Sequence, residues 1–354
     1  MLLNVLYADF GYTGKLIYAY VSYTLLSLVY TAINVPYCAM INNISNDSRE
    51  RVSLQSWRFA LSTLGGLIVS LTALPLVAWL GQGNVQNGYF YTMIVMGCLS
   101  IILFFICFGL TKERYTTDIA VNNQSSILDD LKTLLANKDW RILFALNVVN
   151  LIAVLFKGGT TLYYVNNIMG RADLGSLLLT TTLASGVLGA MLSPFIFKNI
   201  DKVKGFKISM AIEAALLIGM YFVPAGNVAA IFALVIIINI IQLAATPLQW
   251  SMLSDIIDAE EKRSGKKLSG IVFSTNLFAI KLGIAIGGAL VGYMLAWGDY
   301  VGGAAQQTDS ALQMIALLFT VFPGVLVALL IVIMSKYSLD DKRLSRLAQD
   351  DIPA

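Results

Sequence analysis

Histidine is absent from this sequence of 354 residues, and cysteine occurs only three times. A metal centre built on imidazole ligands is therefore excluded, and any proton relay must use carboxylates, lysine or water. Cys98 and Cys107 stand nine residues apart, on opposite faces of a helix, and Cys38 lies in a different apolar segment, so no disulfide is predicted. We expect no cofactor and no metal site in this chain.

Charged residues are also scarce. They make up 13% of the chain, whereas 57% is hydrophobic and the mean hydropathy is +0.74. One soluble core cannot hide so much apolar surface, so the composition predicts an all-α, polytopic membrane protein. About 20 apolar residues cross a bilayer as a helix. The sequence contains nine such spans, at about 15–42, 54–81, 90–111, 140–167, 174–197, 207–224, 227–254, 268–297 and 311–336.

The basic residues indicate the topology, because short cytoplasmic loops carry an excess of lysine and arginine. Of 24 basic residues, 19 fall at one side of the predicted spans. Lys15 and Arg171 fall at the other side, and Arg58, Lys157 and Lys281 fall within spans. This distribution predicts a multi-pass protein of the inner membrane with a cytoplasmic C-terminus.

The longest internal hydrophilic segment, 112–139, separates three predicted spans from six. We expect 1–111 to belong to an N-terminal helix bundle, 140–336 to form a C-terminal six-helix bundle and 337–354 to be a cytoplasmic tail. Within 112–139, apolar residues at helical spacing favour an amphipathic linker on the cytoplasmic surface, and a solvated loop is the alternative.

Lys281 stands near the centre of the apolar span 268–297. It lies ~20 Å from either end, too far for its side chain to reach the lipid headgroups. A lysine at this depth should face protein or a wet cavity, and a salt bridge that only locks two helices is the alternative.

Polar and aromatic stripes run along other spans as well. Those stripes include Tyr30, Asn34, Arg58, Lys157 and Trp250. Hydrogen bonds between helices could explain any single stripe. Several stripes that carry cations and aromatic rings predict instead a central aqueous cavity suited to a polar, hydroxyl-rich solute.

Acids alternate with bases in the stretch SDIIDAEEKRSGKK, which starts at Ser254. A solvated cytoplasmic gate is the favoured interpretation over a metal or catalytic cluster. Pro36 precedes Asp47 by 11 residues, and Pro247 precedes Asp258 by the same interval, which is a weak sign of repeated halves. The predicted gate residues are Asp47, Arg49, Arg51, Asp255 and Asp258.

Apart from basic residues at or next to their ends, the predicted spans hold three cations and one acid, Glu213. Because unpaired buried charge is costly, the excess points to a deprotonated lysine, an anionic substrate or carboxylates on helices outside this chain. Signals for an enzyme are poor: RSGKKLSG lacks the glycine that a phosphate-binding loop requires five positions earlier. No channel filter sequence is present. We expect neither an enzyme nor a nucleic-acid partner.

Several long motifs resemble the glycoside-pentoside-hexuronide:cation symporters, of the melibiose-permease type within the major facilitator superfamily. The motifs are GKLIYAYVSYTLLSLVYTAINVPYCAMINNISNDSRERVSLQSWRF, LKTLLANKDWRILF, TTLYYV and PLQWSMLSDIIDAEEKRSGKKLSGIVFSTNLFAIKLGIAIGGALVGY. The resemblance implies two six-helix bundles, a sugar site near the membrane midplane and alternating access coupled to Na⁺ or H⁺.

The resemblance also implies roles for individual residues. Lys281 in FAIKLG matches the family's lysine beside the cation and sugar sites, and Arg58 in SWRF matches its arginine. Tyr30 and Asn34 in VYTAINVP match sugar-site positions. Asn34 stands where the melibiose permeases have aspartate, and Cys38 stands where they have tryptophan, which puts the sugar preference in doubt.

Members of that family have twelve spans and carry their cation-binding carboxylates on the second one. We therefore expect the first two to three helices to precede Met1, with no cation ligand in this chain. Lys281 would pair with those carboxylates. The predicted function is symport of a sugar or glycoside, its partners being a sugar, a monovalent cation and the lipid bilayer. The alternatives are a truncated membrane protein that does not transport, as a decayed carrier or scaffold, and a carrier for an anionic sugar such as a glucuronide.

Overall fold

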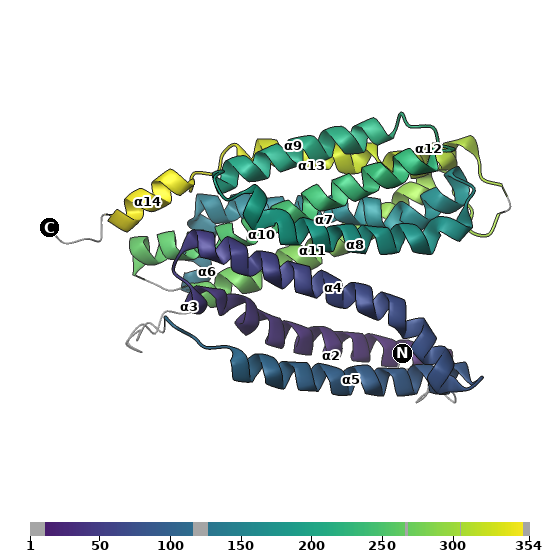
Figure 1. Cartoon of the computed structure of the whole chain (residues 1–354), viewed down its shortest axis with the longest axis horizontal. Helices are drawn as coiled ribbons and strands as arrows, with labels where there is room; N and C mark the ends of the chain where they lie inside the picture. Colours follow the sequence, from purple (N-terminus) through teal and green to yellow (C-terminus); the bar gives the residue numbers. More distant parts are fainter. Residues whose placement is uncertain (1–10, 116–126, 266–267, 305, 350–354) are drawn as a thin grey trace. The chain divides into compact units, whose positions relative to one another are not determined.

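The computed structural model describes residues 11–115, 127–265, 268–304 and 306–349, and the regular elements in these ranges are helices (Figure 1). Eight helical segments there are long and apolar enough to cross a membrane. The prediction of an all-α, polytopic membrane protein is confirmed. The predicted span 207–224 corresponds to α9 (Lys202–Met220). This helix is shorter than the eight segments and contains three lysines and one glutamate.

Some predicted features lie outside the described residues. They are positions 116–126 of the linker, Lys266 and Lys267 of the gate stretch, and 350–354 of the tail.

The chain divides into two compact units. Unit 1 comprises Met1–Ile44 and Gly65–Thr117, and unit 2 comprises Ser45–Leu64 and Asp118–Ala354. Helix α4 (Ser48–Gly81) therefore contributes its first half to unit 2 and its second half to unit 1. The division expected from the sequence, at 112–139, remains a prediction.

Unit 1 contains α2 (Tyr12–Ala39), the short α3 (Ile41–Ile44), the second half of α4 and α5 (Val85–Leu110). Asn84 caps α5, where its side-chain oxygen accepts from the backbone of Gln86 at 3.0 Å. A Cβ atom on Gly88 would lie 2.2 Å from the carbonyl oxygen of Val77, so only glycine permits this close packing of α4 and α5.

Unit 2 contains the first half of α4 and most of the remaining helices. These are α6 (Ile127–Ala136), α7 (Lys138–Tyr163) with its π-helical extension η1 (Tyr164–Ile168), η2 (Ala172–Leu174), α8 (Gly175–Ile196), α9, α10 (Val228–Ser264), α11 (Ser269–Trp297), α12 (Asp309–Phe319), α13 (Val321–Met334) and α14 (Asp341–Gln349). Asn137, Asp201, Asn227 and Thr308 cap the N-termini of α7, α9, α10 and α12. Side chains of these types accept hydrogen bonds from the unpaired backbone N–H groups of a first helical turn.

The long helices of unit 2 pack in neighbouring pairs. Helix α10 packs on α8 and α9, α7 packs on α11 and α13, and α13 also packs on α9. Gly283 and Gly287 of α11 face α7, where an added Cβ atom would lie 2.7 Å and 2.8 Å from the Cβ atoms of Leu151 and Leu155. Small residues four positions apart are a common means of close helix contact in membranes.

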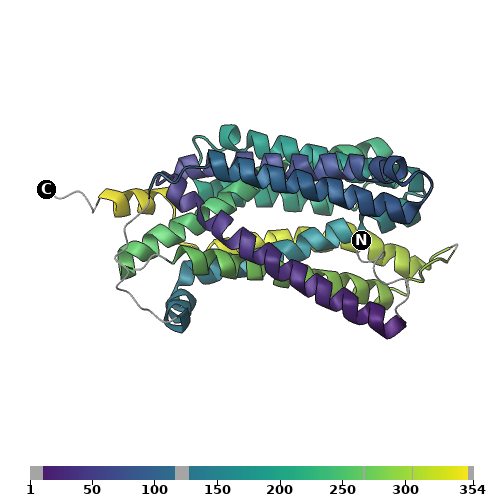
Figure 2. The same cartoon turned by 90° about the horizontal axis from the view of Figure 1, so that it is seen from below.

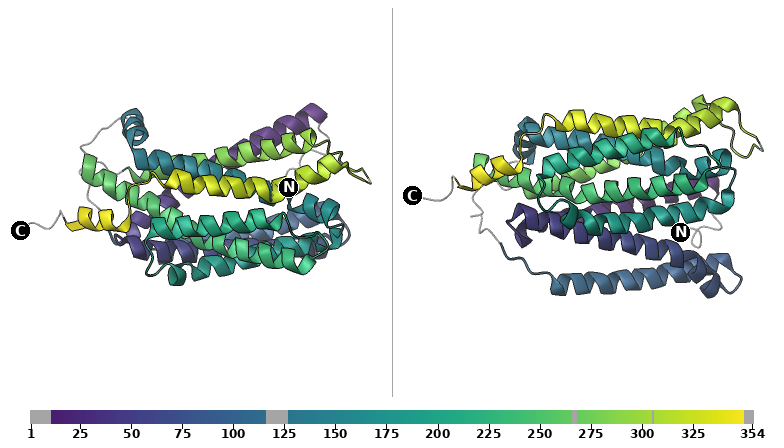
Figure 3. Two further views of the ribbon diagram at one scale, coloured as in Figure 1. Left: turned by 90° about the horizontal axis from the view of Figure 1, so that it is seen from above. Right: turned by 45° about the horizontal axis from the view of Figure 1, so that its top comes forward.

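Four shorter α-helices, α6, α12, α13 and α14, complete unit 2. Helix α6, which covers the segment predicted to be amphipathic, lies crosswise to the long helices of unit 2 (Figure 2). Its Leu134 is fully buried, whereas Leu128 and Leu135 stay exposed. Helices α12 and α13 follow each other end to end with a break at Thr320, and α14 projects beyond the long helices (Figure 3).

Candidate functional site

A charged network lies at the end of unit 2 where α4 and α9 begin and α10 ends. Asp47 and Ser48 start α4, and Asp47 Oδ1 accepts a hydrogen bond from the backbone N–H of Arg49 at 2.9 Å. This cap stabilises the first turn of α4. Arg49 and Arg51 follow in that turn, so their side chains extend from a well-defined helix start.

Arg51 carries the innermost charge of the network. Its side chain is 1% exposed. The guanidinium donates from Nε to the carbonyl oxygen of Ser45 at 2.8 Å and from Nη1 to Asp258 Oδ2 at 2.6 Å. A buried guanidinium needs such partners, because loss of one leaves an uncompensated charge. The contact ties the start of α4 to the end of α10.

A second buried pair joins α9 to α10. The Lys202 ammonium donates to Asp255 and to the hydroxyl of Ser48, and both charged side chains are at most 4% exposed. The Ser48 hydroxyl in turn donates to Asp255 Oδ1 at 2.6 Å, and Ser251 Oγ donates to the Ser48 carbonyl oxygen at 3.1 Å. Asp255 thus accepts hydrogen bonds from side chains of two other helices, α9 and α4.

Asp341, the first residue of α14, brings a third carboxylate to the network. Its oxygens lie 3.6 Å from an Arg49 nitrogen and 3.9 Å from Lys202 Nζ, and its backbone N–H donates to Asp201 at 2.8 Å. Burial raises the pKa of the Asp341 carboxyl above its usual value. The positive charges of Lys202 and, to a smaller extent, Arg49 oppose that rise in pKa, whereas the negative charges of Asp201 and Asp255 reinforce it.

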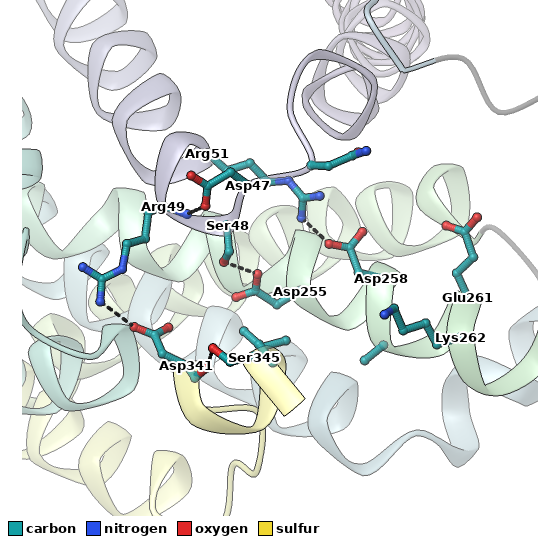
Figure 4. Close-up of a pocket in the computed structure, with 13 residues that line it drawn as sticks. Asp47, Ser48, Arg49, Arg51, Asp255, Asp258, Glu261, Lys262, Asp341 and Ser345 are labelled. Carbon is teal, nitrogen blue, oxygen red and sulfur yellow. Dashed lines mark hydrogen bonds and ion pairs between the residues drawn. The ribbon is translucent and has the colours of Figure 1, made fainter. Parts of the chain in front are cut away.

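These residues surround a cavity of about 730 Å³ (Figure 4). Acidic residues outnumber basic ones in its lining. The acids are Asp47, Asp255, Asp258, Glu261 and Asp341, and the bases are Arg49, Arg51 and Lys262. The arrangement can hold four chain segments together while both signs of charge are present.

Four of the five predicted gate residues meet in this network, namely Arg49, Arg51, Asp255 and Asp258. The fifth, Asp47, lies at the cavity and acts as a helix cap, and it forms no ion pair within the described ranges. Sequence reasoning missed Ser48, Lys202 and Asp341. Lys202 is the first residue of α9 and lies outside the predicted span 207–224.

Arg58 and Trp250 lie together further along α4 and α10. The Arg58 guanidinium carbon is 4.8 Å from the Trp250 ring centroid and 5.6 Å from that of Phe59. Phe59 meets Trp250 edge-on at 5.6 Å, and Phe273 of α11 stacks near it at 6.4 Å. Trp250 is 8% exposed as a result. A cation over an aromatic face is favourable, so this contact stabilises the observed position of both side chains.

A chain of amides links α10, α7 and α11 next to this aromatic cluster. Gln249 Nε2 donates to Asn147 Oδ1 at 2.6 Å, and Asn147 Nδ2 donates to Asn276 Oδ1 at 2.7 Å. All three side chains are buried. Hydrogen bonds of this kind commonly hold helices together in membranes. Gln249 precedes Trp250 directly, so the chain also fixes the part of α10 that carries the ring.

The other predicted site residues lie apart from these two groups. Lys157 of α7 is buried and donates to Asn239 Oδ1 at 3.2 Å and to Gln242 Oε1 at 3.1 Å, both on α10. Lys281 lies half-buried on α11. Tyr30 and Asn34 lie on α2 in unit 1, where Asn34 Nδ2 donates to the Tyr30 carbonyl oxygen at 2.9 Å.

Comparison with known proteins agrees with this architecture. Residues 2–341 match the family described as MFS/sugar transport protein. The chain is 42% identical to the putative glycoside/cation symporter YagG of Escherichia coli K12 over 341 residues, which are 96% of this chain and 74% of that protein. It is 37% identical to the inner membrane symporter YicJ of the same organism, over 93% of this chain and 71% of the relative. The isoprimeverose transporter of Lactiplantibacillus pentosus is 30% identical over 84% of this chain and 62% of the relative.

Proposed function

Because this chain belongs to the MFS/sugar transport protein family, we propose that it carries a sugar or glycoside across the inner membrane by symport with Na⁺ or H⁺. It is a transporter and not an enzyme, as the sequence predicted. The relatives described as a glycoside/cation symporter and an isoprimeverose transporter support a sugar or glycoside as the solute.

The observation that carries the proposal is the buried ionic network at one end of unit 2. Alternating access requires a barrier that is closed in one state and opens in another. Arg51 and Asp258, together with Lys202 and Asp255, join α4, α9 and α10 by contacts that can separate as a set. We propose that this network is the cytoplasmic gate in its closed form and that the C-terminus is cytoplasmic, which the excess of lysine and arginine on that side of the predicted spans supports.

The sugar path is proposed to involve Tyr30, Asn34, Arg58, Trp250 and Lys281. Support comes from the cation-aromatic group of Arg58 and Trp250, since flat rings and hydrogen-bonding groups together suit a hydroxyl-rich solute. The Trp250 ring is covered in the described state, so sugar contact requires Arg58 or Phe273 to move. Lys157, predicted with this set, is held by two amides of α10.

Uptake into proteoliposomes tests the proposal. A panel of neutral glycosides, pentosides and hexuronides is offered under an inward Na⁺ gradient or an inward proton gradient. We expect one solute to accumulate with one of the two ions. Lys281→Ala should weaken ion-driven uptake while insertion into the membrane stays normal, and Lys15→Ala, an exposed lysine of α2, is the matched control. Normal ion-driven uptake by the Lys281 variant would refute its role.

A carrier for an anionic sugar is the second candidate. It is favoured by the charge count of the predicted spans, which hold three cations, Arg58, Lys157 and Lys281, and one acid, Glu213. In the same panel this candidate predicts uptake of hexuronates or glucuronides but not of neutral glycosides. Accumulation of none of the solutes under either gradient would contradict both candidates and favour a chain that does not transport.

A further inference from the structure

Glu213 is an acid buried inside unit 2 with an unsatisfied oxygen. It lies on α9, its side chain is 1% exposed, and its Oε2 atom has no hydrogen-bond partner among the described residues. A buried carboxylate without donors is strongly unfavourable, whereas a protonated carboxyl removes most of that cost. The position therefore suits a group that binds a proton.

Among the described residues, Lys157 of α7 is the cation placed to act electrostatically on Glu213. Its ammonium does not form an ion pair with Glu213 within the described ranges, because Nζ is directed to Asn239 Oδ1 and Gln242 Oε1. The orientation of the Asn239 amide is set by its own Nδ2, which donates to the Val235 carbonyl oxygen at 2.7 Å. The lysine is thus held near the acid without neutralising it by direct contact.

Other charged groups are remote from Glu213. Helix α13, which packs on α9 and α7, carries no titratable residue, and α10 carries none before Asp255, which is ~24 Å along the helix from Asn239. On α9 itself the nearest is Lys207, ~9 Å along the axis, and Lys202 of the charged network is ~16 Å away. The pair is separate from the network around Asp255.

We propose that Glu213 and Lys157 form a proton-binding pair, in which the Glu213 carboxyl takes up and releases one proton while Asn239 and Gln242 hold the lysine. On protonation the new O–H bond forms at a Glu213 oxygen, and on release the proton passes to water. When the Glu213 carboxylate is charged, the pair has no net charge. When the Glu213 carboxyl is protonated, the pair carries one positive charge. Its part in transport rests on the proposed function, but proton binding itself can be measured without transport.

Infrared difference spectroscopy of the purified full chain, titrated from about pH 5 to about pH 10, tests the proposal. We expect a carbonyl stretching band of a buried carboxylic acid that disappears as the pH rises. The band should be absent from Glu213→Gln and shifted in frequency in Glu213→Asp, which keeps the test valid if the glutamine variant does not fold. Glu113→Gln, at an exposed acid of unit 1, is the control and should keep the band.

Lys157→Met provides an independent readout. Removal of the positive charge makes ionisation of Glu213 harder, so the midpoint of the band's titration should rise by about one pH unit. A wild-type spectrum with no band that depends on Glu213 would overturn the proposal, even in protein that transports. A band that titrates as expected in protein that accumulates no solute would uphold the proton site and refute the transport function.

Discussion

Arg51 Nη1 and Asp258 Oδ2 lie 2.6 Å apart, although 207 residues separate them in the chain. The Arg51 side chain is 1% exposed and the Asp258 side chain is 36% exposed, so the free-energy cost of desolvation falls mainly on the arginine. The contact and its neighbour between Lys202 and Asp255 hold the end of α10 against the start of α4 and of α9. The proposed gate is sensitive to loss of an acid, because Arg51 or Lys202 would then stay buried without its carboxylate partner.

Substitution of Arg51 by alanine should lower the stability of unit 2. We expect a loss of about 3 kcal/mol, at the lower end for buried pairs because Asp258 is partly solvated. The double variant Arg51→Ala, Asp258→Asn should recover part of this loss, since no unpaired charge is left. Thermal unfolding in detergent measures the difference.

The exposed pair of Arg171 and Asp173 is the control for this cycle. Its side chains are 51% and 60% exposed, and the guanidinium lies 2.8 Å from the carboxylate. Arg171→Ala should cost no more than about 1 kcal/mol, because exposed pairs contribute little. Equal losses at Arg51 and Arg171 would contradict the buried-gate interpretation.

Substitution of Trp250 by alanine should weaken sugar binding. If the ring contacts the sugar in the open state, its removal should raise Kd about tenfold, which corresponds to about 1.4 kcal/mol. Trp79→Ala, at a ring of unit 1 that is 73% exposed, should leave Kd unchanged. Isothermal titration with the transported solute provides the measurement, and an unchanged Kd for the Trp250 variant would exclude the contact.

Asp341 should make stability depend on pH. Because burial raises its pKa, the folded protein binds a proton more readily than an exposed carboxyl does. The folded state therefore gains stability as the pH falls through the raised pKa toward the usual value, and loses it as the pH rises. Asp341→Asn lacks this dependence, so its Tm should increase relative to wild type as the pH rises through that window.

Asp129→Asn controls for a general effect of removing an acid. Asp129 lies on α6 with 59% of its side chain exposed. The Tm of this variant should follow the wild-type value across the same pH window. A constant difference between wild type and Asp341→Asn at all pH values would contradict the assignment to Asp341.

Gly283 should tolerate no side chain. An added Cβ atom would lie 2.7 Å from Leu151 Cβ and 2.8 Å from the Val148 carbonyl oxygen, so α11 and α7 would have to move apart. Gly283→Ala should therefore destabilise unit 2 by about 1 to 3 kcal/mol. Gly292→Ala on the same helix meets no atom within 4 Å and should be neutral or slightly stabilising, because alanine is the better helix former. Thermal unfolding distinguishes the two, and equal Tm values would contradict the close α7–α11 packing.

Hydropathy located the membrane helices well but misjudged some ends. The predicted span 207–224 began after Lys202, because lysines reduce hydropathy, yet α9 begins at that residue. The Lys202 ammonium group donates hydrogen bonds to Asp255 and Ser48, and these contacts stabilise a lysine in the first turn of the helix. The predicted span 311–336 contains a break at Thr320, where the backbone is not helical. The periodicity of hydrophobic residues could not indicate this break.

The sequence by itself determined that this is a helical membrane protein, because span length and the scarcity of charge depend only on local composition and on the bilayer's thickness. It also singled out Arg51, Asp255 and Asp258 as charges at helix ends. Only the tertiary structure decided their partners, since the pairs are 53 and 207 residues apart and depend on how the helices pack. The same holds for Lys157 and Glu213, since the sequence placed Lys157 in a polar stripe and counted both residues in a charge imbalance but did not pair them. Packing brings them into electrostatic reach while two amides hold the lysine.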